Sequence, residues 1–211
     1  MVILKISSDF EKFKNRYVNY SIIGLALSWY YELLSLVLKR IQKTTKNTME
    51  TKTVQQELFV KMILSAWDTQ NSNLDKLAAT LTDEQFLKEI APGKNTGIYL
   101  FGHLIAVNDA MLPLLGFGEK LFPQLEDIFI KNPDKSHLEK PSLAELKEYL
   151  KVINAKLAVH IQSTTPAEWF RRHTAVSEED FAKEPYRNKL NVMISRTNHM
   201  SYHLGQMALL K

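Results

Sequence analysis

Hydrophobic residues recur at helical spacing along most of this chain, and no segment shows the strict alternation that is typical of a strand. Between Val54 and Thr80 the apolar positions fall about every three to four residues, which places them on one face of a helix. The same spacing predicts three further long helices, over about residues 95–115, 142–163 and 187–211. Four long helices without strands indicate an all-α protein built as a four-helix bundle.

Capping signals mark where these helices begin and end. Ser142 and Glu145 have the spacing of a capping box, and either Asn95 or Thr96 is placed to cap the helix before it. The glycine-rich segment 116–118 ends that earlier helix. Further capping residues predict short helical segments, which begin at Thr82, Thr165 and Ser177.

Residues 1–48 differ in character from residues 53–211, which we take as the main domain. The apolar run from Ser21 to Leu38 contains a single charged residue, Glu32, and is just long enough to span a membrane. Three interpretations stay open: a membrane-associated or docking helix, an additional core helix, or translated upstream sequence ahead of a natural start at Met49. Residues 1–48 are therefore predicted to be an N-terminal helical extension that need not belong to the native domain.

The distribution of charge argues against a nucleic-acid-binding protein, although the net charge is +4 and the pI is 9.1. Of the 27 basic and 23 acidic residues, eight basic and three acidic ones lie in residues 1–48. The rest of the chain holds 19 basic and 20 acidic residues, a net charge of −1. It has no overall field that would attract a phosphate backbone.

Two histidines near the C-terminus, His199 and His203, are four residues apart on the last predicted helix. At about 100° per residue they share one face, which lies beside the apolar stripe of that helix. Such a pair can bind one cation. Met200 stands where a zinc protease would have its glutamate, which excludes that class. Because the chain has no cysteine, any metal must be held by histidine and carboxylate side chains.

Three polar residues share the flank of the histidine pair and are candidate substrate contacts: Ser195, Arg196 and Gln206. Arg196 could pair with a substrate carboxylate, and Gln206 could donate or accept a hydrogen bond beside a metal. Gly205, next to them, would leave room for the close approach of another helix or of a ligand.

His103 lies in the predicted helix 95–115, which is apolar on nearly every side and is therefore expected to be buried. A buried imidazole needs a partner, since an unsatisfied polar group costs roughly 1–3 kcal/mol. Two solutions stay open for His103: a metal shared with the last helix, or a hydrogen bond to a backbone carbonyl or to Asp109. Among the other histidines, His160 could point inward, whereas His137 and His173 lie in polar segments and are expected to be exposed.

The G-H-L sequence around His103, taken together with N-H-M-S-Y-H-L-G-Q at the C-terminus, resembles the DinB-like superfamily of metalloenzymes. The resemblance covers about residues 53–211 and includes the P-G-x-N loop that precedes the G-H-L helix. It implies an up-down-down-up four-helix bundle with one divalent metal ion, such as zinc, nickel or iron, held by His103, His199 and His203. Residues 1–48 have no counterpart in the family pattern.

The resemblance also implies a class of function. Its members include thiol-dependent S-transferases and an isomerase, besides DNA-damage-inducible proteins without an established activity. Three imidazoles leave a coordination position open on a metal. We therefore expect an enzyme that activates a low-molecular-weight thiol cosubstrate, or water, for transfer to a small electrophile. The contrasting possibility is a non-catalytic metal- or ligand-binding stress-response protein of the same fold.

For partners and location, we expect a cytoplasmic homodimer that acts on a small-molecule substrate and does not bind nucleic acid. Association with a membrane would require that the segment 21–38 inserts.

Overall fold

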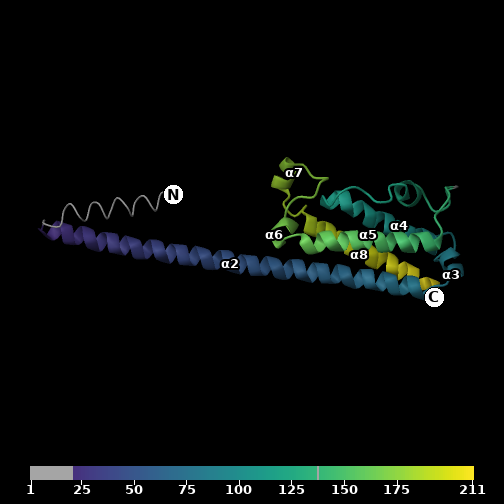
Figure 1. The fold of residues 1–211 in the computed structure, drawn as a ribbon, viewed down its shortest axis with the longest axis horizontal. Helices are drawn as coiled ribbons and strands as arrows, with labels where there is room; N and C mark the ends of the chain where they lie inside the picture. Colours follow the sequence, from purple (N-terminus) through teal and green to yellow (C-terminus); the bar gives the residue numbers. More distant parts are fainter. Residues whose placement is uncertain (1–20, 137) are drawn as a thin grey trace. The chain divides into compact units, whose positions relative to one another are not determined.

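The computed structural model describes residues 21–136 and 138–211, with side chains from Ser28 onward (Figure 1). Within these residues every regular element of secondary structure is a helix, and β-type pairing is confined to two isolated bridges. The predicted all-α class is therefore confirmed. The chain divides into two compact units between Val54 and Gln55, and each unit is described by itself.

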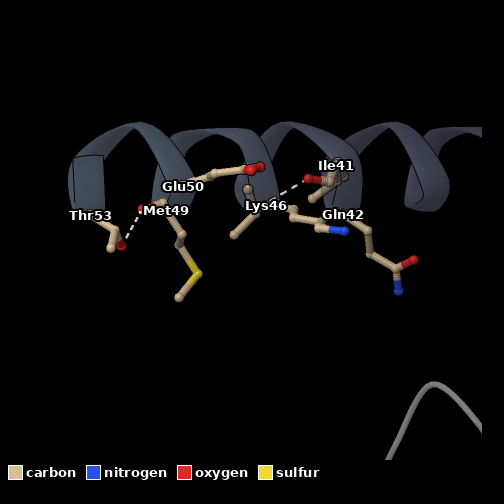
Figure 2. A pocket seen from close by; sticks show the side chains of 7 residues that line it. Ile41, Gln42, Lys46, Met49, Glu50 and Thr53 are labelled. Atoms are coloured by element: carbon tan, nitrogen blue, oxygen red, sulfur yellow. Dashed lines mark hydrogen bonds between the residues drawn. The ribbon is translucent and has the colours of Figure 1, made fainter. Parts of the chain in front are cut away.

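Helix α2, Ser21–Thr80, is longer than the sequence pattern predicts, because it continues without a break through the threonine-rich stretch before Val54. Five threonine hydroxyls in this stretch donate hydrogen bonds to the backbone carbonyl four residues earlier, from Thr44, Thr45, Thr48, Thr51 and Thr53. Figure 2 shows the bond from Thr53 to Met49, beside a hollow lined by α2 residues between Ile41 and Thr53. These bonds satisfy the hydroxyls inside the helix, so a run of β-branched residues remains helical.

The predicted membrane association through residues 21–38 depends in part on residues 21–27, whose side chains lie outside the described part of the chain. Further along the same helix, Trp29, Tyr30 and Leu33 are each more than half exposed. Among the described residues, helix α4, Gly97–Leu115, is the one helix with the length and mean hydropathy, 1.5, of a membrane span. Its apolar window is 72% buried inside the protein.

In the second unit, four long helical segments contribute to one hydrophobic core: α2 from Gln55, α4, α5 (Leu143–Ser163) and α8 (Lys189–Met207). Five shorter elements connect and flank them: α3 (Asp83–Leu87), the π-helix η1 (Asp127–Lys131), α6 (Pro166–Trp169), α7 (Glu178–Lys183) and the 3₁₀-helix η2 (Ala208–Leu210). The four long helices match the predicted set, while the up-down-down-up order of their directions stays a prediction.

Most helix boundaries follow the predicted capping residues. Ser142 and Thr82 each form a complete capping box, and Ser177 accepts a hydrogen bond from the backbone of Asp180. Of the two candidates before α4, Thr96 is the residue that caps the helix. At the other end of α4, Gly116 adopts a left-handed conformation with φ of 75°, which a residue with a side chain rarely adopts.

Helix α4 lies at the centre of the unit and packs against α5, α8, α3 and η1. Its one buried carboxylate, Asp109, accepts backbone N–H bonds from Leu121 at 2.8 Å and Phe122 at 2.9 Å. This carboxylate therefore anchors the irregular segment that follows α4, which leads on to η1. Asp109 is accordingly not the partner of His103.

Candidate metal centre

Three histidines from two helices converge in the second unit. His103 comes from α4, and His199 and His203 come from the C-terminal half of α8. The Nε2 atom of His199 lies 3.1 Å from Nε2 of His103 and 3.0 Å from Nε2 of His203. One nitrogen from each ring lies within 4.8 Å of the other two, so the three rings could hold one metal ion.

The outer nitrogen of His103 is fixed by the π-helix η1. His103 Nδ1–H donates a hydrogen bond to the backbone carbonyl of Phe129 at 2.7 Å. Because a carbonyl oxygen can only accept, this bond sets the proton of the neutral ring on Nδ1 and leaves a lone pair on Nε2. The predicted alternatives for His103, a carbonyl partner or a shared metal, are therefore compatible, since each uses a different ring nitrogen.

Gly102 explains how η1 approaches α4 so closely. A Cβ atom added at Gly102 would lie 2.4 Å from two ring carbons of Phe129, and Phe129 has no solvent exposure. The absence of a side chain at Gly102 therefore makes the space that the Phe129 ring fills. The ring is thereby packed one residue away from His103, and the Phe129 carbonyl reaches the imidazole.

His203 is held in the same way by a residue of its own helix. Its Nδ1–H donates to the Gln206 side-chain oxygen at 2.7 Å, while the Gln206 amide donates to the Tyr202 hydroxyl at 3.2 Å. The Tyr202 ring also meets His203 edge-on, with ring centroids 5.1 Å apart. Nε2 of His203 therefore also carries a lone pair, and this nitrogen lies beside His199.

His199 occupies the middle of the cluster. Burial, followed by the charges of His203, His103 and Arg196, lowers the pKa of His199 to about 4, so the ring is neutral near pH 7. Burial is also the largest cause of the lowered pKa of His203. His199 Nδ1 is buried without a hydrogen-bond partner. The rings of His199 and His203 are therefore neutral near pH 7, and Nε2 of His199 lies about 3 Å from Nε2 of each of the other two rings.

Hydrogen bonding alone does not satisfy this arrangement. The Nε2 atoms of His103 and His203 both carry lone pairs, and His199 Nε2 holds at most one proton to share between them. At least one of these two lone pairs therefore lacks a full hydrogen bond, although each nitrogen lies about 3 Å from His199 Nε2. A cation bound between the three atoms would satisfy the unpaired nitrogen.

The distances suit a first-row divalent ion. Metal–nitrogen bonds of about 2.0–2.1 Å place two imidazole nitrogens about 2.9 Å apart in octahedral and about 3.3 Å apart in tetrahedral geometry. The separations of His199 Nε2 from the Nε2 atoms of His203 and His103, 3.0 Å and 3.1 Å, lie between these values. Among the described residues, no carboxylate forms an ion pair with any of the three rings, so the ligand set is neutral.

Comparison with known families agrees with the fold. The profile of the DinB superfamily matches residues 66–207, which is most of the second unit and includes all three histidines. This chain belongs to the DinB superfamily. The crystal structure of a conserved protein from Enterococcus faecalis has a similar fold, with a TM-score of 0.50 and 15% identity over 71% of this chain and 93% of that one. No curated protein matches the chain significantly.

The other predicted site residues of this DinB-superfamily protein lie at different distances from the cluster. Gln206 contacts His203 directly, and Arg196 is half-buried one turn before His199. Ser195 is exposed and forms no side-chain hydrogen bond with the cluster. A Cβ atom at Gly205 would meet nothing within 4 Å, so no helix packs closely there.

The remaining histidines do not join the cluster. The His160 ring stacks on Phe117, at 4.9 Å between centroids, which confirms that it points inward without making it a ligand. His173 is half-buried rather than exposed. His137 lies outside the described residues.

Two groups that position the cluster were not predicted from the sequence: the carbonyl of Phe129 and the hydroxyl of Tyr202. The residue type at position 129 does not show what its backbone carbonyl contacts, and the sequence D-I-F-I-K does not indicate a π-helix. Tyr202 lies one residue before His203 in the sequence, but only its contact with Gln206 reveals its role.

The contact between Gln206 and His203 leads to a first prediction. Gln206→Leu removes the acceptor for His203 Nδ1–H and is expected to weaken zinc binding about 10- to 100-fold. Gln206→Glu keeps an acceptor and should bind zinc at least as tightly as the wild type. Competition titration against a chromophoric zinc chelator measures both constants, and equal affinity of Gln206→Leu and wild type would contradict the orienting role.

Proposed function

We propose that this DinB-superfamily protein is a metal-dependent enzyme that activates a low-molecular-weight thiol cosubstrate for attack on a small electrophile, with water as the alternative nucleophile. The observation that carries the proposal is the meeting of three imidazole Nε2 atoms with no neutralising carboxylate in the part of the chain that the structure describes. His103, His199 and His203 would hold the metal. Elemental analysis of the purified protein distinguishes zinc, nickel and iron.

The neutral ligand set favours a catalytic over a purely structural site. A divalent ion held by three imidazoles keeps its full charge and an open position, and so lowers the pKa of a bound thiol or water. Gln206 and the Phe129 carbonyl keep two of the rings in the tautomer that offers Nε2. Because the chain has no cysteine, the thiol must come from outside the protein.

Transfer of the thiol sulfur to the electrophile requires no reactant besides these two substrates. The cosubstrate sulfur forms a bond to an electrophilic carbon, the leaving group departs with its electron pair, and the thiol proton passes to solvent. This chemistry needs no oxidant or reductant. The residues of the flank, Ser195, Arg196 and Gln206, remain candidate contacts for the two substrates.

Conjugation of thiols to monochlorobimane tests the proposal. Full-length protein loaded with zinc, nickel or iron(II) is incubated with glutathione, cysteine or other small thiols, and the fluorescent conjugate is followed over time. We expect metal-dependent conjugation with at least one thiol, and none above background with His103→Ala. Rates that match the metal-free protein for every thiol would instead support the non-catalytic metal- or ligand-binding protein.

A further inference from the structure

Arg196 is a half-buried charge beside the histidine cluster that the site does not otherwise use. It lies three residues before His199 on α8, which is nearly one helical turn. Its Nε atom is buried and has no hydrogen-bond partner. Among the described residues, no aspartate or glutamate forms an ion pair with its guanidinium.

Two arginines in the segment before α8 show the contrast. Arg187 pairs with Glu184 at 3.1 Å, and Arg172 donates to the Val176 carbonyl at 2.8 Å and lies 3.6 Å from Glu178. Arg196 has no comparable partner within residues 21–136 and 138–211, although it is half-buried. Removing a charge from water without a counter-ion is unfavourable, so the position is suited to an anion that comes from outside the chain.

The charge of the whole cluster is consistent with this expectation. Among the described residues, no aspartate or glutamate forms an ion pair with any of the three rings. Arg196 lies three residues before His199 on α8, so the two side chains are neighbours on one side of that helix. A divalent ion held by the rings would add two further positive charges, so the occupied site would carry about three positive charges and no compensating carboxylate.

We propose that Arg196 binds a carboxylate of the molecule that occupies the histidine centre, so that the thiol cosubstrate is an acidic thiol. This inference rests on the proposed function, because it names the chemical class of that cosubstrate. The planar guanidinium presents parallel N–H donors that match the two oxygens of a carboxylate. The ligand therefore has two anchors: sulfur toward the histidine cluster, and a carboxylate toward Arg196.

Three thiols of matched size test the proposal directly: 3-mercaptopropionate, 2-mercaptoethanol and 2-aminoethanethiol. They share a thiol on a two-carbon chain and differ in a terminal carboxylate, hydroxyl or ammonium group. Calorimetric titration of the zinc-loaded full chain is expected to show binding of 3-mercaptopropionate at least about tenfold tighter than that of 2-mercaptoethanol, and weakest binding of 2-aminoethanethiol. Equal constants for the three thiols would overturn the role of Arg196.

Variants at Arg196 identify the source of the preference. Arg196→Gln should bind the three thiols with similar constants, while Arg196→Lys keeps part of the preference. Arg187→Gln removes one positive charge elsewhere on the chain and should behave as the wild type does. Zinc content is measured for each protein, and a preference that survives in zinc-loaded Arg196→Gln would contradict the proposal.

Propionate, which has no thiol, separates this inference from the proposed function. If no thiol binds in a zinc-dependent manner, the thiol chemistry is wrong. Binding of propionate to the wild type that is at least about tenfold weaker in Arg196→Gln would still support a carboxylate site at Arg196. Equal binding of propionate to both proteins, or none to either, would overturn it.

Discussion

Replacing His199 with alanine is expected to abolish stoichiometric metal binding while the protein remains folded. His199 Nε2 lies 3.1 Å and 3.0 Å from the other two candidate ligand atoms, so its loss removes the central member of the cluster. We expect the affinity to fall by more than the roughly 10- to 100-fold loss that follows removal of an outer hydrogen-bond partner. Elemental analysis after dialysis gives metal per chain, and circular dichroism reports helix content.

His173→Ala is the matched control for this experiment. His173 is half-buried and its pKa is lowered mainly by burial, as for His199, but it lies outside the cluster. It should keep the metal content of the wild type. One metal per chain in purified His199→Ala, or loss of metal from His173→Ala alone, would show that the ligands lie elsewhere.

Gly102→Ala is expected to weaken both the fold and the metal site. The new Cβ would lie 2.4 Å from the Phe129 ring, which is fully buried, so the ring or the helix would have to shift. Overpacking of this kind costs about 1–3 kcal/mol of unfolding free energy. Displacement of Phe129 also moves the carbonyl that orients His103, so zinc affinity should fall about 10- to 100-fold. Urea unfolding and chelator competition measure the two effects.

Gly205→Ala is the control for the loss of a helical glycine. Its Cβ would meet nothing within 4 Å, so the change should stabilise α8 by up to about 1 kcal/mol through helix propensity. The double variant Gly102→Ala/Phe129→Leu removes the clashing ring carbons and should recover part of the zinc affinity. If Gly102→Ala binds zinc and unfolds as the wild type does, close packing of η1 on α4 does not position His103.

The local part of the site could be predicted from the sequence because it depends on one helix. The spacing of His199 and His203 and the shared flank of Gln206 follow from about 100° per residue. The capping boxes at Thr82 and Ser142 are equally local, and both are formed. Periodicity also identified the four long helices, although it could not show that α2 continues back to Ser21.

The parts that depend on tertiary contacts could not be derived from spacing. That His103 meets the α8 histidines came from the family resemblance, since the periodicity of one helix does not show which helix faces it. The fixed tautomer of His103 depends on a backbone carbonyl in a π-helix, and the space for that helix depends on Gly102. Arg196 could be placed on the correct flank, but only its burial without an acidic partner among the described residues shows that it is suited to binding an anion.

Anomalous diffraction from crystals of the zinc-loaded protein, recorded on both sides of the zinc absorption edge, would show whether His103, His199 and His203 together bind one divalent metal ion. We expect one strong peak about 2.0–2.1 Å from the Nε2 atoms of all three histidines. Absence of a peak between these atoms at full zinc loading, or a single peak bound to other residues, would contradict binding of the ion by these three histidines.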